Sequence, residues 1–486
     1  TREGGRRGSP EGGVQCILER STTSLLAQVE QQEERLVAVP LDDRLLTSIE
    51  LPATDSQYLK PPDEAVVEVK VDRYPVGQLP SQGHVARSLA VNAGPEADLD
   101  LLITKHGLRE LPAAPKASLK TPDAKERDDL TKLPTLLLAP WSSPDAPLLP
   151  AVSLESGEAG HRLWVHAPAV AERVGFDSAL DLHLRDQAEA LCLGNSWIPL
   201  LTAALSKAAA FKAGSAEAAL SVLLDFDAEG VLQHYRFCRS TIQVDGVVDA
   251  KALQALADRK PKARTTPAAL KALKDQLPLL EQLIELAQLL RQQRLSGGSI
   301  DLDLAMPAID GLGDLAVPEP DERRQGWLVQ LDPASDPSGL LRELVLPAHR
   351  ALGRHLAALE LPAIYAHNPA PDAEALNDVA KAALALDIPL ELSADGNVSA
   401  QELAQAFALS DRCRVLQQQL REPLKPVTLA AEPGANALAA ESVALAPWCC
   451  PGLHYADLWN QHVLVLLLSE GKDRPSVRHK TRVDIA

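Results

Sequence analysis

Carboxylates that could hold a metal ion stand at three places in this chain. Asp145 lies in the proline- and serine-rich segment APWSSPDAPLLP, and Asp301 and Asp303 alternate in SIDLDLAM. Glu343 lies on a segment with helical spacing. Hard cations such as Mg²⁺ need several oxygen ligands within one small space. Each of these residues also has an alternative to a metal or catalytic role. Asp145 would form a turn, Asp301 and Asp303 would lie on a solvated strand edge, and Glu343 would lie on a solvated helix face.

Basic side chains cluster near the end of the sequence. Within KDRPSVRHKTRVD these are Lys472, Arg474, Arg478, Lys480 and Arg482. Contact between such residues and RNA phosphates releases counterions, which favours an RNA-binding role for Arg478 and Lys480. A solvated terminal segment is the alternative.

Composition and charge exclude several classes of protein. The 486 residues carry a net charge of −18, which argues against a protein that coats nucleic acid over its whole surface but leaves room for a local basic groove. No apolar run has the length of a membrane span, and no signal peptide is expected. The six cysteines show no C-x-x-C spacing, so we expect no zinc or redox motif and a cytoplasmic location.

The elements that must position these residues begin with a run of short strands. Residues 26–80 alternate apolar and polar positions in VAVPLDDRLLTSIEL and EAVVEVKVDRYP, with turn residues between them. Several short strands within about 60 residues predict a small barrel. We therefore expect a disordered lead-in over 1–25, a barrel with its connector over 26–114, and a second domain over 115–486.

The second domain is predicted to mix strands with helices. Residues 161–170 and 219–244 are typical of strands, the latter folded as a hairpin that turns at Asp227–Gly230. Leucines at helical spacing predict a long core helix over 267–295, which Pro278 divides or kinks. Further helices are expected near residues 339–359, 373–386, 400–421 and 455–470.

From residue 127 onward, short motifs follow one another in an order that resembles the RNB domain of the ribonuclease II/R family. They are RDDL (127–130), VHAPAV (165–170), IPLLTAALS (198–206), RSTI (239–242), LRELVLPAHRALGRHL (341–356), IYAHNPAPD (364–372) and CCPGLHYADLWNQHVL (449–464). Upstream, VAVPLDDRLLTSI and GHVARSLA resemble the cold-shock OB barrel that precedes this domain in the family. No single motif is specific, but their order over most of the chain is, and the chain is identified as a member of this family.

The resemblance implies both a fold and an activity. The fold is α+β, with a cold-shock-type OB barrel followed by a mixed α/β RNB domain. The activity is hydrolysis of single-stranded RNA from its 3′ end by two divalent cations, which would be Mg²⁺ if this chain is active. The family also carries a C-terminal OB-type RNA-binding barrel, so we expect a chain that either lacks that barrel or is a truncated piece.

The departures from the family pattern fall on the metal site. The four metal-binding aspartates of the family fall here on Ala139, Asp145, Pro147 and Leu148. One aspartate cannot hold two metal ions, so Asp145 is a remnant of the catalytic set. Glu343 matches a family glutamate and is kept.

Positions that contact RNA in the family are also altered. Both arginines of the family's I-R-R-Y turn are lost, since the turn reads Gly452 to Tyr455, and a tyrosine that stacks on the RNA 3′ end falls on Cys192. His454 and Tyr455 occupy the turn where the family contacts phosphate and sugar, which implies a role in RNA binding; packing at a helix start is the alternative. An aspartate of the V-H-I-A-D-V strand falls on Ala169.

The helix that follows this turn carries two more polar residues. Asp457 and Gln461 are expected to cap the helix or to face solvent.

Three hypotheses follow from the sequence. The leading one is an RNA-binding protein with reduced or absent hydrolytic activity, needing no cofactor and having single-stranded RNA as its partner. The second is an active Mg²⁺-dependent 3′→5′ exoribonuclease whose ligands come from elsewhere in the chain. The third is a scaffold or adaptor that binds a protein partner and no RNA, which the acidic net charge favours. None of the three involves a membrane.

Overall fold

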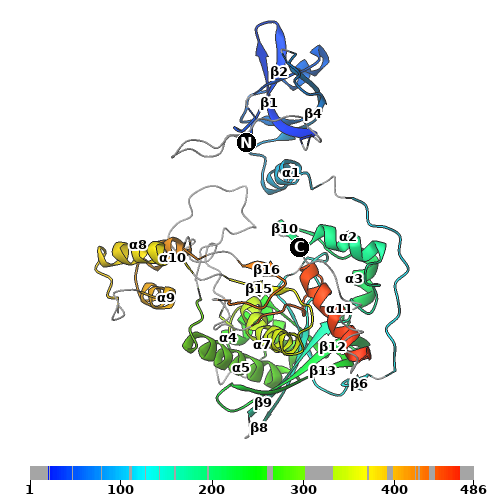
Figure 1. The fold of residues 1–486 in the computed structure, drawn as a ribbon, viewed down its shortest axis with the longest axis vertical. Helices are drawn as coiled ribbons and strands as arrows, with labels where there is room; N and C mark the ends of the chain where they lie inside the picture. Colours follow the sequence, from blue (N-terminus) through cyan, green and yellow to red (C-terminus); the bar gives the residue numbers. More distant parts are fainter. Residues whose placement is uncertain are drawn as a thin grey trace. The chain divides into compact units, whose positions relative to one another are not determined.

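The structure, a computed structural model, describes residues 20–301 and 332–470, apart from 21, 46, 78, 109–111, 126, 142, 158–159, 194–195, 260–265, 369–370, 391–397, 422, 425–426 and 437–443. The chain divides between Ala113 and Ala114 into an N-terminal unit and a C-terminal unit (Figure 1). Most of the expected lead-in lies outside the described residues, and the first strand begins at Ser24.

The N-terminal unit is a closed barrel of five short strands. Their order around the barrel is β1 (Ser24–Gln32), β2 (Arg35–Pro40), β3 (Ile49–Glu50), β5 (Ser81–Ala90) and β4 (Ala65–Arg73). Alternate apolar side chains point inward, so Val29, Ala38, Val67 and Val85 share one core. The predicted barrel is confirmed. A 3₁₀ helix, η1 (Ala53–Tyr58), and helix α1 (Pro95–Lys105) complete the unit.

A seven-stranded sheet forms the centre of the C-terminal unit. Its strand order is β14 (Gly246–Asp249), β7 (Leu136–Ala139), β8 (Ala151–Gly157), β9 (Gly160–Pro168), β12 (Ala216–Phe226), β13 (Leu232–Gln243) and β6 (Asp128–Asp129). Strands β12 and β13 form the predicted hairpin, in which the backbone N–H of Gly230 donates to the carbonyl of Asp227. The strand predicted over 161–170 is confirmed as β9.

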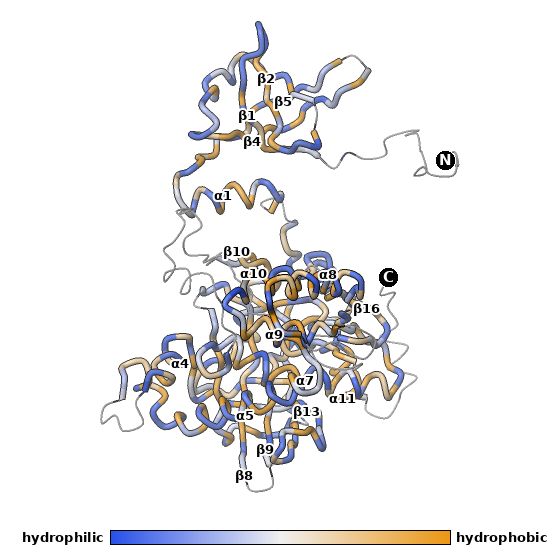
Figure 2. Tube along the Cα trace, turned by 90° about the vertical axis from the view of Figure 1, so that its left-hand side faces the viewer, coloured by the Kyte–Doolittle hydropathy of each residue, from blue (hydrophilic) through white to orange (hydrophobic). Residues whose placement is uncertain are grey.

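Helices α5 (Leu277–Ser296) and α7 (Pro337–Ala358) pack against each other and against this sheet. The predicted leucine stripe is core. Figure 2 shows that apolar and polar residues alternate along α5 and α7, as expected for helices with one buried face. The single helix predicted over 267–295 is wrong in its first part, because a 3₁₀ helix, η2 (Ala268–Leu273), precedes α5. Pro278 lies in the first turn of α5, where its missing N–H costs no helical hydrogen bond.

Smaller helices surround the sheet edges and the far end of the unit. They are α2 (Ala179–Gln187), α3 (Ala203–Ala209), α4 (Ala250–Ala257), α8 (Ala373–Leu384), α9 (Ala400–Ala408), α10 (Cys413–Arg421) and α11 (Tyr455–Glu470). The helix predicted over 400–421 is two helices, because the chain turns at Ser410 and packs α10 back on α8 and α9 around Leu403 and Phe407. Two short antiparallel strand pairs complete the unit: the hairpin of β10 (Leu191–Leu193) with β11 (Ser196–Ile198), and β15 (Tyr365–His367) with β16 (Thr428–Ala430).

A row of polar side chains crosses the sheet interior. Thr135 and Ser153 lie 2.7 Å apart, and His166 is hydrogen-bonded through its two ring nitrogens to Ser153 at 3.1 Å and to Ser221 at 2.7 Å. Ser240 continues the row 2.5 Å from Ser221. All five residues are buried. The imidazole satisfies its hydrogen bonds with neutral partners, and burial lowers the pKa of His166 to about 3.

Candidate functional site

Three loops of the C-terminal unit meet at one place. They are the loop after β7 (residues 139–148), the segment around the β10–β11 hairpin (189–198) and the turn before α11 (450–454). The backbone N–H of Ala190 donates to the carbonyl of Leu453 at 2.9 Å, and a Cβ added to Gly452 would lie 2.9 Å from the backbone nitrogen of Leu148. The structure therefore brings together the positions at which the sequence departs from the ribonuclease II/R pattern.

The first loop is apolar where a metal site would need oxygen ligands. Ala139 ends β7, and together with Pro147 and Leu148 it lines a pocket of about 110 Å³. The other lining residues are apolar as well: Leu137, Leu138, Trp141, Ala146, Leu149, Pro168, Ala210 and Phe211. Such a pocket excludes the hydrated oxygen shell that Mg²⁺ keeps.

Asp145 lies on the outside of this loop. It is exposed, and its backbone N–H donates to the Ser143 hydroxyl at 3.4 Å, a long bond of the kind that turns contain. Among the described residues, no group of three or more histidine, cysteine, aspartate or glutamate side chains is placed to hold a metal ion. The residues present at these positions therefore do not fit the divalent cations of the family, and no hydrolytic step is assigned to them.

The turn before α11 carries a histidine in place of an arginine. His454 is about half exposed, and its Nδ1 lies 3.4 Å from a carboxylate oxygen of Glu189. Backbone pairing between the same two residues joins the turn to the segment before β10. His454 is thus accessible at the site, but its nearest charged partner is a carboxylate.

Tyr455 is packed inside the protein at the first residue of α11. It is 5% exposed, its hydroxyl accepts a hydrogen bond from Nε of Arg185 at 3.2 Å, and burial raises its pKa above the ordinary range. Arg185 also pairs with Asp177 and Asp181. His462, which is buried on α11, has its Nε2 3.2 Å from a carboxylate oxygen of Asp181. This network joins α2 to α11, so Tyr455 has a structural role.

Asp457 and Gln461 were expected to cap the helix or to face solvent; both are buried, so the solvent-facing alternative is wrong. Asp457 accepts a hydrogen bond from the backbone N–H of Cys450 at 2.8 Å, and burial raises the pKa of its carboxyl to about 7. Gln461 donates to the carbonyls of Pro168 and Trp448. Asp457 therefore fixes the turn 450–454 at Cys450, whereas Gln461 joins α11 to the end of β9 and to the backbone just before the turn.

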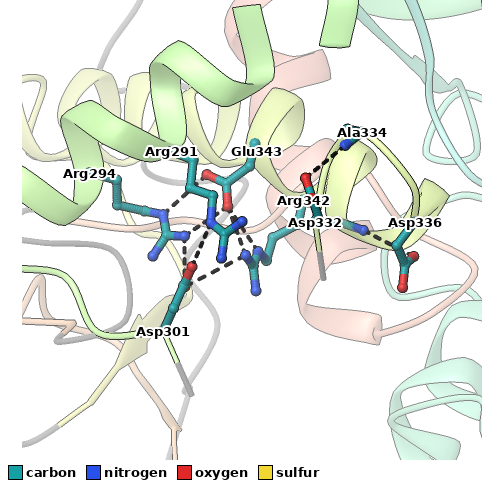
Figure 3. A network of polar contacts seen from close by, with 9 residues as sticks. Arg291, Arg294, Asp301, Asp332, Ala334, Asp336, Arg342 and Glu343 are labelled. Carbon is teal, nitrogen blue, oxygen red and sulfur yellow. Dashed lines mark hydrogen bonds and ion pairs between the residues drawn. The ribbon is translucent and has the colours of Figure 1, made fainter. Parts of the chain in front are cut away.

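Glu343 is also buried, which corrects the expectation of a solvated helix face. It is 1% exposed, and Arg294 donates to both of its carboxylate oxygens, at 3.1 and 2.8 Å. Arg342 donates to Glu343 at 2.8 Å, and Arg294 and Arg291 pair with Asp301 (Figure 3). Asp301 lies after α5 and in no strand. Two carboxylates held by three guanidinium groups are committed to ion pairs and have little capacity for a metal ion.

Residues of the retained family motifs also serve the fold. Arg127 donates to the carbonyl of Ser240 at 3.0 Å and forms an ion pair with Glu172, which in turn lies 3.2 Å from Arg239. Ala169 is fully buried. The motifs that survive in the sequence are therefore those that build the scaffold.

Six of the residues singled out in the sequence lie outside the described residues: Asp303, Lys472, Arg474, Arg478, Lys480 and Arg482. Cys192 is exposed on β10 and lies opposite Trp197 of β11 in the strand register.

Sequence reasoning missed the aromatic residues of the site. Trp141 and Trp197 are both partly exposed, and their ring centroids lie 4.8 Å apart at an interplanar angle of 58°. The sequence gives little indication of these two tryptophans, except that aromatic residues are rare in this chain, at 3%. Their proximity depends on the meeting of two loops and could not be read from spacing.

The fold and these motifs define a class of protein. The RNB domain family matches residues 127–470, and the chain belongs to that family. Among curated proteins it is 31% identical to the acetazolamide conferring resistance protein zam of Synechocystis sp., over the whole of this chain and 62% of that protein. It is 23% identical to ribonuclease R of Thermotoga maritima, over 76% of this chain and 51% of that protein. The chain thus spans less than two thirds of the length of either relative.

Solved structures show the same fold. Apo RNase R of Mycoplasma genitalium has a TM-score of 0.74 and 16% identity, covering 97% of this chain and 75% of that chain. The same enzyme is known in complex with ribose-methylated single-stranded RNA, with a TM-score of 0.72. Yeast Ssd1, described as a pseudonuclease, has a TM-score of 0.65 and 14% identity, covering 96% of this chain and 58% of that chain.

Proposed function

We propose that this protein is a non-hydrolytic member of the RNB family that binds single-stranded RNA. The observation that carries the proposal is the apolar pocket at the positions of the metal ligands. Ala139, Pro147 and Leu148 offer no oxygen ligand from their side chains, and Asp145 is exposed in a turn. Two-metal hydrolysis needs both cations held about 4 Å apart by shared carboxylates, and one carboxylate cannot do this.

The RNA-binding part of the proposal is supported by the family and by the fold. The RNase R of Mycoplasma genitalium, which shares the fold, is known with single-stranded and with double-stranded RNA. The net charge of −18 implies that any RNA contact in this chain is local. We therefore expect a short RNA footprint and a modest dependence of affinity on salt, because few phosphates would be neutralised.

The setting of the proposed function is the cytoplasm. Cys238, Cys413, Cys449 and Cys450 carry free thiols, which suits a reducing compartment. In the described part of the chain, no helix combines the length and the apolar character needed to cross a bilayer.

The proposal is tested with end-labelled single-stranded RNA in the presence of Mg²⁺ or Mn²⁺. We expect an anisotropy change that reports binding and no shortening of the RNA on a denaturing gel. Processive shortening from the 3′ end that Asp145→Asn abolishes would establish the exoribonuclease alternative instead. Absence of any salt-dependent RNA affinity would establish the adaptor alternative, with a protein as the partner.

A further inference from the structure

A second pocket of the C-terminal unit lies where the β12–β13 turn meets helices α5 and α7. Its volume is about 330 Å³, a size typical of small-molecule sites. Gln293 of α5 donates to the carbonyl of Glu229 at 2.7 Å, and a Cβ added to Gly230 (φ 80°) would lie 2.9 Å from Leu289. These contacts hold the turn against α5, so this wall of the pocket is preformed.

This pocket is distinct from the site formed by the loops 139–148, 189–198 and 450–454. Phe226, which lines it, pairs with His161 near one end of β9, whereas Pro168 at the other end of β9 lines the apolar pocket of the first loop. The length of β9 between His161 and Pro168 corresponds to roughly 23 Å. A small molecule bound here would not reach the positions of the lost metal ligands.

Arginine side chains give this pocket a positive charge in a protein of net charge −18. Arg294, Arg350 and Arg354 line it, and among the described lining residues only Glu343 carries a carboxylate. Both oxygens of that carboxylate accept hydrogen bonds from Arg294, and one of them also accepts from Arg342 (Figure 3). The lining therefore has a surplus of positive charge, which favours an anionic ligand.

The spacing of two of these arginines favours a phosphate group. Arg350 and Arg354 are one helical turn apart on α7, so they lie on the same face of the helix. Arg354 is exposed, and no carboxylate of the described residues lies at ion-pair distance from it. A phosphate monoester carries nearly two negative charges at neutral pH, whereas a carboxylate carries one, so two guanidinium groups match the phosphate better.

The opposite part of the lining is apolar. It consists of Phe226, Val231, Leu232, Leu290, Leu346 and Pro347. Such a wall suits a ring or another apolar body attached to the phosphate. Inorganic phosphate alone would leave this wall in contact with water, so an organic phosphate uses more of the pocket.

We propose that this pocket binds the phosphate monoester of a ring-bearing molecule of the size of a nucleoside monophosphate, with Arg350 and Arg354 on the phosphate. The same group also occurs at the 5′-phosphorylated end of an RNA chain, which is the second possible source. The inference goes beyond the proposed function, because it does not depend on RNA binding at the three loops.

Isothermal titration calorimetry of the full chain with adenosine 5′-monophosphate tests the inference. Adenosine and inorganic phosphate are the comparison ligands. Adenosine should bind at least about 10-fold more weakly, because it lacks the charge-assisted contacts to arginine. Inorganic phosphate should also bind more weakly, because it leaves the apolar wall uncovered.

Two exposed positions test the location of the site. Arg354→Gln should weaken binding of the nucleotide about 5-fold or more, whereas Arg412→Gln, an exposed arginine between α9 and α10, is the matched control. Val231 is 48% exposed, so Val231→Asp adds a carboxylate to the pocket and should also weaken binding. Val231→Asn has nearly the same shape as the aspartate without its charge and should have the smaller effect. Melting temperatures close to that of the wild type show that the variants are folded.

Oligouridines of about 12 nucleotides, with a 5′-phosphate or a 5′-hydroxyl, separate the two sources of the phosphate. Nucleotide binding that Arg354→Gln weakens supports the site and identifies a free nucleotide as its ligand. Binding that depends on the 5′-phosphate of the oligouridine and on Arg354, without binding of the free nucleotide, supports the site and identifies an RNA end.

Three results would overturn the inference. They are equal affinities for the nucleotide and adenosine, equal effects of Arg354→Gln and Arg412→Gln, and the absence of binding by both phosphate-bearing probes. Each of them leaves the proposed function standing, because RNA binding without hydrolysis is measured separately with the unphosphorylated oligouridine.

Discussion

Arg294 donates to both carboxylate oxygens of Glu343, and neither side chain is more than 4% exposed. A bidentate pair of this kind is among the strong polar contacts of a protein interior. The glutamate that the sequence marks as a family residue is therefore held within the scaffold, between α5 and α7. Substitution of Glu343 should therefore lower the free energy of unfolding.

We expect Glu343→Gln to destabilise the protein by about 3 kcal/mol. Removing one partner of a buried ion pair leaves the other charge uncompensated, and here Arg291, Arg294 and Arg342 would share the single carboxylate of Asp301. Urea unfolding measures the change. Asp378→Asn, which breaks the exposed Lys381–Asp378 pair, is the control and should have a much smaller effect. Equal effects of the two substitutions would contradict the buried network.

The free energy of unfolding should fall as the pH drops from about 6.5 towards 4. Burial lowers the pKa of His166 and of His349 to about 3, whereas an unfolded histidine titrates near 6.5. The unfolded state therefore binds protons in this window that the folded state does not, so acid favours unfolding. Asp457 acts with the opposite sign, because its folded pKa of about 7 lies above its unfolded value.

Two variants separate these contributions. His166→Asn should flatten the pH dependence by up to about 1.4 kcal/mol per pH unit between pH 6 and 4, the value for one proton. Asp457→Asn should steepen it, since it removes a group that contributes stability at low pH. Chemical denaturation at several pH values measures both slopes, and a flatter slope for Asp457→Asn would show that the sign assigned to it is wrong.

The close approach of the 450–454 turn to the first loop predicts an effect of adding one methyl group. A Cβ at Gly452 would lie 2.9 Å from the Leu148 nitrogen, so Gly452→Ala forces the two loops apart and should cost about 1–3 kcal/mol. Gly157→Ala is the matched control, because no atom lies within 4 Å of its added Cβ. It should change the free energy of unfolding by less than about 0.5 kcal/mol. Equal melting temperatures for the two variants would contradict the loop contact.

Restoring a carboxylate to the first loop should not create a metal site. Leu148 packs against the main core and lines the apolar pocket, so Leu148→Asp should lower the melting temperature in buffers with or without Mg²⁺. Leu148→Asn has nearly the same shape without the charge and serves as the control. Stabilisation by Mg²⁺ that occurs in the aspartate variant alone would show that the loop can still assemble ligands.

Much of the fold could be predicted from local pattern. The β12–β13 hairpin and the leucine stripe of α5 depend on periodicity and turn residues, which the sequence carries directly. The division of 400–421 at Ser410 could not be predicted, because the polar residues there are compatible with one exposed helix. Only the packing of α10 back on α8 and α9 selects the turn.

The absence of metal ligands at the site could be predicted from the sequence, whereas the contacts that the site does contain could not. The positions of Ala139, Pro147 and Leu148 follow from motif order alone. The ion pair that accompanies the burial of Glu343 is with Arg294, which is 49 residues away in the sequence. The contact between Trp141 and Trp197 likewise joins two loops that are far apart in the sequence. Long-range partners of this kind have no periodic signature.

The contact between Gly452 and Leu148 also limits how the protein can change by descent. An aspartate regained at position 147 or 148 would face apolar neighbours, and an arginine regained at position 454 would meet Glu189 and no metal-bound phosphate. The aspartate would weaken the fold and the arginine would pair with Glu189, so neither change taken alone would supply a set of metal ligands. If the proposed function holds, a two-metal site would need several substitutions at once in this protein, whereas a change of binding partner could begin with a single one.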